Sequence, residues 1–232
     1  MENPEAQAAL ALARVPLFAE FSEHELQALV SHVRRRRYGA DEIVFEQHGP
    51  GTTFYLIQTG VIKVYLSSPD GRDIVLAILH AGEFFGELSL IDGLPRSASA
   101  AALDPAETLE IGRDDFKRML GEHHEATYKV CAVLARRLRR SDGIIADAAF
   151  LDLRTRLAKR LLELAQEFGN PQGGTIELTM TLRQQALADL VGVTRESVNR
   201  ALGALESEGL VSFVRGKITL LRPEDLARLC EE

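Results

Sequence analysis

The residues best suited to chemistry lie in one segment, Phe84–Ala100, which we call the cassette. The cassette turns at Gly86, offers a carboxylate at Glu87 and carries Arg96 and Ser97 next to each other. A guanidinium is a planar fork of donors that fits two phosphate oxygens, and a hydroxyl and backbone N–H groups can satisfy the others. A carboxylate beside a phosphate is favourable only if it faces hydroxyls, as acidic residues do on ribose. These residue types therefore suit a ribose phosphate.

The backbone of the cassette adds to this interpretation. Small residues at Gly86 and Ala98 would let N–H groups approach an anion closely. A short helix over Leu88–Ile91 would point its N-terminus at the phosphate. For an arbitrary glutamate and arginine, the alternative is a solvated salt bridge across a loop.

The whole pattern, G-E-L-S-L-x-D-G-x-P-R-S-A, resembles the phosphate-binding cassette of cyclic-nucleotide-binding domains. It is most similar to the cyclic-AMP receptor branch of the Crp/Fnr family of bacterial transcription regulators. The resemblance implies cyclic AMP as the effector and no metal. It implies that Glu87 binds the ribose hydroxyl and that Arg96 and Ser97 bind the cyclic phosphate. The predicted nucleotide contacts are Gly86, Glu87, Leu88, Arg96, Ser97, Ala98, Ser141 and Asp142.

The elements that must position the cassette are short strands. Between Tyr38 and Ile111, apolar runs alternate with turn residues. The runs are Ile43–Phe45, Phe54–Ile57, Val61–Leu66, Ile74–Leu79, Ala98–Leu103 and Thr108–Ile111, and the turns fall at Gly49–Gly51, Thr59–Gly60, Pro69–Gly71 and Ala81–Gly82. Many short strands with such turns predict an antiparallel sandwich or jelly roll that the cassette interrupts.

Helices are expected on both sides of the strands. Leu10–Val15 and Ser22–Val33 precede them, and Ser22 and Glu25 form a capping-box pattern. The basic run Arg34–Arg37 is interpreted as a solvated helix exit without a function. Helices over 114–120 and 122–149 follow the strands.

The second of these later helices carries a heptad seam. Its positions recur at alternating steps of four and three, namely Thr127, Cys131, Leu134, Leu138, Ser141, Ile145 and Ala148. Such a seam packs against the same helix of a second subunit or against the strands, and the residues alone leave both open. Because the family uses this helix as its dimer interface, the resemblance implies a homodimer.

Ser141 is a hydroxyl in this otherwise apolar seam. Its hydroxyl could bond back to the carbonyl one turn earlier. The resemblance implies instead that Ser141 bonds the purine and that Asp142 reaches the nucleotide of the other subunit. A carboxylate at 142 can accept from an adenine amine but also suits the paired donors of guanine, so the preference between cyclic AMP and cyclic GMP stays open.

The C-terminal part contains a helix, a glycine turn and a second helix over Thr181–Leu202. Gly192 supplies the turn and Thr194 is a good N-cap for the second helix. The inward positions are Ala186, Leu187, Leu190, Val198, Leu202 and Leu205. This pattern predicts a helix-turn-helix.

Polar residues on the early turns of the second helix are placed to enter a major groove. Arginine pairs with guanine and glutamate accepts from cytosine, although any one of these residues could simply be solvated. R-E-x-V-x-R resembles the recognition helix of the same family and implies TGTGA-like half-sites read by Arg195, Glu196 and Arg200. The predicted DNA contacts are Thr194, Arg195, Glu196, Ser197, Asn199 and Arg200, with Arg215 and Lys217 on a hairpin wing.

Composition limits the remaining classes. The chain has 232 residues, 46% of them hydrophobic, which suffices for two domains, and it has no apolar run of ~20 residues and no signal-peptide start. The net charge is −7, and residues from Asp152 onward carry 11 Lys and Arg against 12 Asp and Glu, so the acidity lies mainly in the first part. We therefore expect a cytoplasmic protein without membrane contact whose C-terminal domain binds DNA with modest non-specific affinity.

Other functions fit less well. No Gly-x-Ser-x-Gly, His-Glu-x-x-His or P-loop pattern occurs, which argues against an enzyme. Two distant cysteines cannot hold an iron–sulfur cluster by several thiolates. A haem-gated regulator using His80, His123, His124 or Cys131 is an alternative, but it leaves the cassette unused. A nucleotide-independent regulator is a further one.

The sequence thus predicts an α+β protein: a jelly-roll sensor domain over 1–121, a dimerisation helix and hinge over 122–151, and a winged helix-turn-helix over 152–232. Its expected partners are double-stranded DNA, a second copy of the chain and RNA polymerase.

Overall fold

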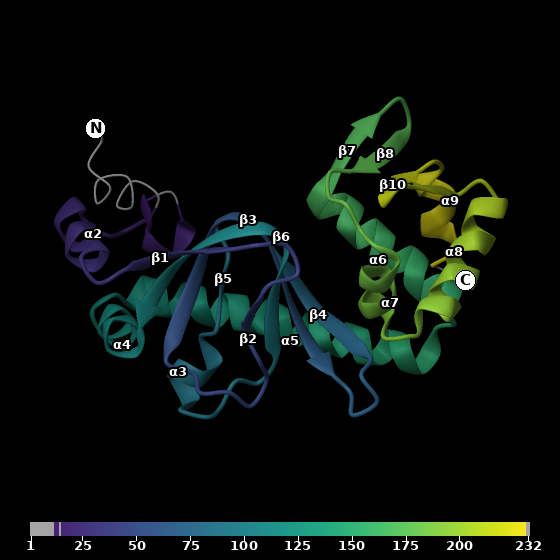
Figure 1. Ribbon diagram of the computed structural model, residues 1–232. Coiled ribbons are helices and arrows are strands. Elements are labelled where there is room, and N and C mark those ends of the chain that lie inside the picture. The colour runs from purple at the N-terminus through teal and green to yellow at the C-terminus, as the bar shows by residue number, and fades with distance from the viewer. Residues whose placement is uncertain (1–11, 14, 231–232) are drawn as a thin grey trace. The chain divides into compact units, whose positions relative to one another are not determined.

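The computed structural model describes residues 12–13 and 15–230, which form two compact units (Figure 1). One unit comprises the chain up to Tyr65 and Ala77–Arg139, and the other comprises Leu66–Leu76 and the chain from Arg140. Most of the helix expected at Leu10–Val15 falls outside the described residues, although Leu12 and Ala13 are helical.

The main sheet is antiparallel throughout, which confirms the predicted strand architecture. Its path runs β1-β6-β3-β4, with β2 paired to β6 and β5 paired to β3. The strands are β1 (Arg34–Tyr38), β2 (Ile43–Phe45), β3 (Thr53–Ser67), β4 (Asp73–Leu79), β5 (Phe84–Phe85) and β6 (Ser99–Gly112).

Two of these strands are longer than predicted. β3 and β6 each join two expected strands, and the turn predicted at Thr59–Gly60 is wrong. Gly60 instead lies within β3 at a shift of register, with φ of +83°. A Cβ there would be 2.2 Å from the carbonyl oxygen of Pro105, so the glycine allows β6 to approach at a bulge.

The prediction that the basic run 34–37 is the exit segment of a helix is also wrong. The run forms most of β1, which pairs with the 106–110 part of β6 at the end of the sheet path. Arg35 and Arg37 both contact Glu107 across this pair, at 3.1 and 2.7 Å. Charged side chains on an edge strand discourage pairing with another chain.

The helices of the first unit pack on one face of the sheet. They are η1 (Pro16–Phe18), α2 (Glu23–Val30), α3 (Leu88–Asp92), α4 (Arg113–Glu122) and α5 (His124–Phe150), of which α5 continues into the second unit. The predicted capping box of Ser22 and Glu25 is confirmed, although α2 ends at Val30. Phe54, Leu109 and Phe116 are in the core between sheet and helices, whereas Tyr55 and Phe85 belong to a second core on the other side of the strands.

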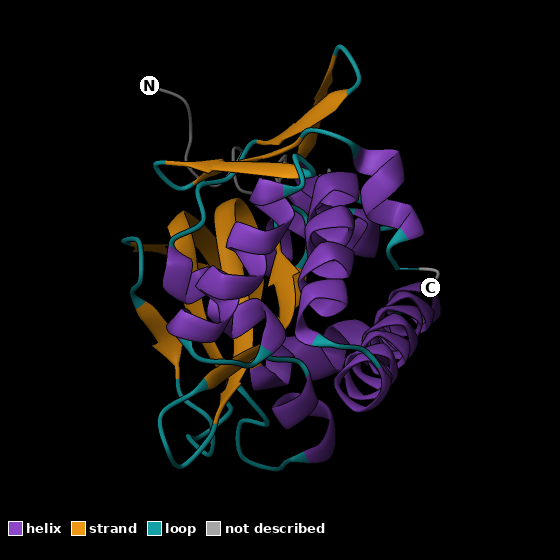
Figure 2. Ribbon diagram, turned by 90° about the vertical axis from the view of Figure 1, so that its right-hand side faces the viewer, coloured by secondary structure: helices purple, strands orange, loops and turns teal. Residues whose placement is uncertain are grey.

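Besides Leu66–Leu76 and the end of α5, the second unit contains a winged helix-turn-helix. It contains α6 (Leu153–Phe168), β7 (Gly169–Gln172), β8 (Thr175–Leu178), α7 (Gln184–Val191), α8 (Arg195–Ser207), β9 (Val211–Val214), β10 (Lys217–Leu220) and α9 (Pro223–Arg228). Its sheet has the order β7-β8-β10-β9. β7 and β8 form a β-hairpin that turns at Gly173 and Gly174 and projects from the helices in Figures 1 and 2.

Within the described part of the chain, none of the helices combines the length and the apolar character needed to cross a lipid bilayer.

Candidate nucleotide site and nucleic-acid interface

Arg96 is held inside the first unit, with an exposed fraction of only 3%. Its Nη1 donates to the carbonyl oxygen of Gly86 and its Nη2 to that of Thr53, both at 2.7 Å. Its Nε is buried without a hydrogen-bond partner among the described residues. Burial lowers the pKa of Arg96, and the negative charge of Glu87 opposes that shift. An arginine remains charged despite such a shift, so Arg96 is a buried cation whose Nε–H is still available as a donor.

Gly86 makes this arrangement possible. Its φ is +82°, and a Cβ would lie 2.7 Å from the Arg96 Nη1 and 3.0 Å from the Thr53 carbonyl oxygen. Any side chain would therefore strain the backbone and collide with the guanidinium. The glycine that the sequence indicated for close approach of an anion also provides the space for Arg96.

Glu87 is equally buried, with an exposed fraction of 2%. The Oε1 atom of Glu87 accepts a hydrogen bond from Nη1 of Arg137 at 3.0 Å. The Oε2 atom is buried and has no hydrogen-bond partner among the described residues. Arg137 also donates to the carbonyl oxygen of Phe84. One carboxylate oxygen is thus fixed by α5 and the other remains available as an acceptor.

Sequence reasoning missed two arginines that brace the cassette. Arg137 stands one helical turn before Ser141 on the same face of α5, and that spacing was the available signal. Arg113 donates from Nη2 to the carbonyl oxygens of Gly51 (2.6 Å) and Ser89 (3.2 Å), and so ties α3 to α4. No motif marks Arg113, because its partners are backbone groups distant in sequence.

The other predicted nucleotide contacts are placed as follows. Leu88 begins α3 and is exposed, Ser97 is exposed, and Ala98 is buried before β6. Ser141 is half-buried and Asp142 exposed, both on the part of α5 in the second unit. The first unit therefore brings Gly86, Glu87 and Arg96 into contact.

The seam of α5 is largely exposed. Cys131 is exposed, and Leu138 and Ile145 have exposed fractions of 64% and 68%. Ala126 and Val130, on the adjacent face of the same helix, pack against the core of the first unit. Leu134, another position of the seam, is partly buried against that core, so part of the apolar seam packs within the chain and part is exposed.

The haem-ligand alternatives occupy separate places. The ring of His80 contacts the carbonyl oxygen of Ala81, and that of His123 stacks on Phe21 at 3.7 Å between centroids. His124 begins α5, and Cys131 is in the seam. Over the residues that the structure describes, no group of three or more His, Cys, Asp and Glu is arranged to hold a metal ion.

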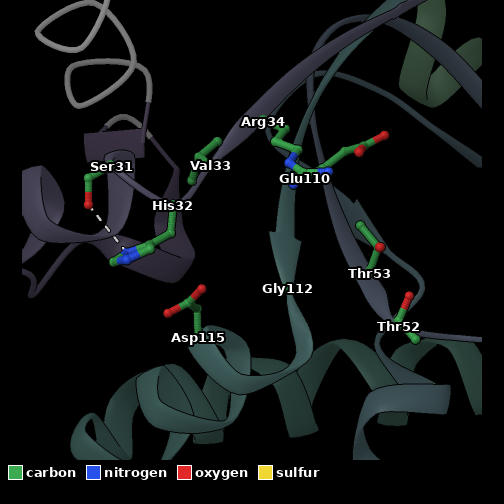
Figure 3. Close-up of a pocket in the computed structure, with 9 residues that line it drawn as sticks. All are labelled: Ser31, His32, Val33, Arg34, Thr52, Thr53, Glu110, Gly112 and Asp115. Atoms are coloured by element: carbon green, nitrogen blue, oxygen red, sulfur yellow. Dashed lines mark hydrogen bonds between the residues drawn. The ribbon is translucent and has the colours of Figure 1, made fainter.

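A polar cavity of about 530 Å³ opens beside the start of β3 and α4 (Figure 3). It is lined by Ser31, His32, Val33, Arg34, Thr52, Thr53, Glu110, Gly112 and Asp115. None of the predicted site residues lines it. Thr53, whose carbonyl oxygen accepts from Arg96, lies between this cavity and the cassette.

The helix-turn-helix forms as predicted. α7 ends at Gly192, which has φ of +68°, and α8 begins after Thr194, whose hydroxyl accepts from the backbone N–H of Ser197. Leu187, Val198 and Leu205 are fully buried. These buried contacts between α7 and α8 hold the early turns of α8 in place.

The predicted DNA-contacting side chains differ in their exposure and in the hydrogen bonds that they already make within the chain. Arg195, Glu196 and Arg200 are exposed. Arg195 Nε donates to Gln184 at 2.8 Å, and Arg200 Nη2 donates to Ser197 at 3.4 Å. Asn199 is half-buried, and its Oδ1 has no partner within the described chain.

On the wing, Arg215 lies at the tip of the β9–β10 hairpin, is exposed and has φ of +52°. Lys217 is exposed and pairs with Glu177 at 3.1 Å. Its ammonium group would have to leave that carboxylate to contact DNA.

Comparison with known proteins agrees with the nucleotide site in the first unit and with the helix-turn-helix in the second. Residues 35–123 match the model of the cyclic nucleotide-binding domain, and residues 155–229 match that of the Crp-like helix-turn-helix domain. The chain belongs to the Crp/Fnr family of transcription regulators. Proteins of this family are transcription regulators rather than enzymes, in agreement with the sequence prediction.

Relatives of this Crp/Fnr protein include two with similar overall length. A CRP-like cAMP-activated global transcriptional regulator of Mycobacterium tuberculosis is 35% identical, over 94% of this chain and 97% of the relative. The cyclic AMP receptor protein of Thermus thermophilus is 34% identical, over 88% and 91%. A solved structure of the c-di-GMP responsive regulator CLP of Xanthomonas campestris has a TM-score of 0.73 at 26% identity, over 82% and 94%.

Proposed function

We propose that this Crp/Fnr regulator is activated by cyclic AMP and binds palindromic TGTGA-like DNA as a homodimer. It would work in the cytoplasm and contact RNA polymerase there. The cyclic-nucleotide-binding domain and the Crp-like helix-turn-helix are its two parts. The choice of effector, the DNA sequence and the dimer rest on the arguments that follow.

The pair of unsatisfied buried atoms at the cassette carries the proposal. Arg96 Nε is a donor and Glu87 Oε2 an acceptor, and neither is hydrogen-bonded within the described chain. Unsatisfied buried polar groups are costly, so they suggest a missing partner. A cyclic ribose phosphate offers both partners, an anionic oxygen for Arg96 and the 2′-hydroxyl for Glu87.

The remaining contacts of the nucleotide follow from neighbouring residues. Ser97 and the N–H of Ala98 would bind phosphate oxygens, beside the backbone of Gly86 and Leu88. Ser141 would bond the purine, and Asp142 would reach the nucleotide of the second subunit. Two relatives named for cyclic AMP favour adenine, although a carboxylate at 142 would also accept guanine.

The dimer would form along α5. The exposed seam positions Cys131, Leu138 and Ile145 are apolar and recur along one face of α5, with the half-buried Leu134 and Ser141 between them. A self-complementary stripe of this kind is typical of an isologous two-fold interface.

On DNA, Arg195, Glu196 and Arg200 would read bases in the major groove, with Asn199 beside them. Thr194, Ser197, Arg215 and Lys217 would contact the backbone. The nucleotide would act by binding one orientation of the two recognition helices better than another.

Calorimetry with cyclic AMP, cyclic GMP and cyclic di-GMP tests the effector. We expect one cyclic AMP per chain, and at least about 100-fold weaker binding after Arg96→Met, because the charge-assisted hydrogen bond from Nε and the charge that attracts the phosphate are both lost. Arg118→Met, at an exposed position of α4, is the matched control and should bind normally. Tighter binding of another nucleotide, or a haem absorption band in the purified protein, would overturn the proposal.

A further inference from the structure

Aromatic rings surround the Arg96 guanidinium. Its central carbon is 4.2 Å from the centroid of the Phe45 ring and 5.6 Å from that of Tyr55. Phe45, Tyr55 and Phe85 contact one another, with centroid separations of 4.9 to 5.8 Å, and the Tyr55 and Phe85 rings are nearly parallel at 11°. We call Phe45, Tyr55 and Phe85 the aromatic cluster.

Three separate strands supply this cluster. Phe45 ends β2, Tyr55 is in β3 and Phe85 is in β5. β2 is paired irregularly, with a register shift between Ile43 and Phe45. Ile43 is exposed, whereas Phe45 is partly buried and faces the guanidinium.

The aromatic cluster contributes to the compensation of the buried charge of Arg96. A buried charge requires compensation, normally from an opposite charge. The negative charge of Glu87 favours the charged guanidinium, but the hydrogen bond of this carboxylate is with Arg137. The guanidinium of Arg96 is surrounded by two carbonyl oxygens, to which it donates, and by two ring faces. Ring faces are electron-rich and attract a desolvated cation.

We propose that the aromatic cluster, and Phe45 above all, is a positioning element that holds Arg96 ready for the phosphate before any nucleotide arrives. This inference rests on the proposed nucleotide function and extends it to residues outside the cassette. A free arginine side chain has many rotamers, and ordering it upon binding weakens affinity. Cation–π contact with Phe45, together with the two carbonyl bonds, orders it beforehand.

The first test needs no nucleotide. In NMR spectra of the ligand-free full chain with ¹⁵N-labelled arginine, the Arg96 Hε resonance should be shifted upfield by the ring current and should exchange slowly with water. Phe45→Leu should return it towards the position of a free arginine. A wild-type Arg96 resonance at the free-arginine position would refute the proposal by itself.

The second test separates electrostatics from shape. Replacing Phe45 with phenylalanines that carry one, two and three ring fluorines weakens the ring quadrupole while keeping a similar shape and an apolar surface. The logarithm of the Kd for cyclic AMP should rise stepwise with fluorine number, to about 3- to 30-fold overall. The same series at Phe54, which stacks on Phe116 at 4.7 Å in the other core, is the matched control and should leave Kd unchanged.

The two hypotheses fail differently. Wild-type protein that binds no cyclic nucleotide would contradict the proposed function, and the NMR measurement would still decide the role of the cluster. Normal wild-type binding with a Kd indifferent to fluorination at Phe45 would mean that the ring only fills space. Equal trends at Phe45 and Phe54 would also contradict specific positioning.

Discussion

At the scale of single residues, the cassette depends on Gly86 as much as on the charged groups. Replacing it with alanine would put a Cβ 2.7 Å from Arg96 Nη1 at a φ of +82°. We expect Gly86→Ala to displace the guanidinium and to reduce affinity for cyclic AMP by at least about 100-fold, since both charge-assisted bonds of Arg96 depend on that position. Calorimetry measures this loss.

Gly93 provides the matched control. Its φ is +78°, but a Cβ there has no neighbour within 4 Å. Gly93→Ala therefore carries a similar backbone strain without touching Arg96, and its affinity should stay within a few-fold of wild type. Similar losses in both variants would mean that strain, rather than the space needed by Arg96, explains the glycine.

The sequence predicted the residue types of this site better than their partners. Glu87, Arg96 and Gly86 were identifiable because they are adjacent within one motif. Arg113 was not, because it acts on backbone groups more than twenty residues away, and Arg137 was marked only by its spacing from Ser141. A contact between side chains far apart in the chain produces no repeating pattern from which it could be predicted in a single sequence.

At the scale of elements, α5 should be the dimer interface. We expect Leu138→Glu to convert the dimer into a monomer, because it would bury a charge in an apolar two-fold seam. Sedimentation velocity reports the mass. Arg136→Glu is the control, because Arg136 is exposed on the side of the same helix opposite to the seam, and this variant should remain dimeric.

Cys131 gives an independent check of that seam. A residue on a two-fold axis meets its own copy, so mild oxidation should cross-link wild-type chains. Cys131→Ser should abolish the cross-link and Cys230→Ser should not. Unchanged mass in Leu138→Glu together with cross-linking through Cys230 would place the interface elsewhere.

The cap of α6 should make stability depend on pH. Asp152 accepts from the backbone N–H of Thr155 at 2.8 Å, and this bond lowers the pKa of Asp152. A lowered pKa stabilises the fold above the unfolded-state value of about 3.9, and the contribution is lost as pH falls through the folded-state value. We expect Asp152→Ala to cost about 1 kcal/mol at pH 7 and progressively less below pH 4, measured by urea unfolding.

Asp152→Asn separates the cap from the charge. Asparagine caps helices about as well as aspartate but does not titrate, so its stability relative to Asp152→Ala should change little with pH. A cost of Asp152→Ala that stays constant between pH 3 and pH 7 would contradict the assigned role of the carboxylate.

The sequence predicted these elements with uneven success. The α2 cap, the helix-turn-helix and α3 followed from local signals and are confirmed. The turn predicted at Thr59–Gly60 is wrong, because a glycine at a bulge within a strand looks like one in a turn. Only the partner strand distinguishes these cases.

At the scale of the whole molecule, the acidic charge lies mainly in the sensor part, so little non-specific attraction to DNA is expected. Specific binding should therefore depend on how the recognition helices are presented. Under the proposed function, the nucleotide controls that presentation. The coupling must also be reciprocal, so DNA should tighten cyclic AMP binding by the same factor.

The most direct test is the affinity for a labelled duplex with two inverted TGTGA half-sites, measured by fluorescence anisotropy with and without saturating cyclic AMP. We expect cyclic AMP to tighten binding by the wild-type chain at least about 5-fold, within the usual range of allosteric coupling. Arg96→Met should keep the nucleotide-free affinity and lose the response. Equal wild-type affinity with and without cyclic AMP, or a full response in Arg96→Met, would contradict the proposed function.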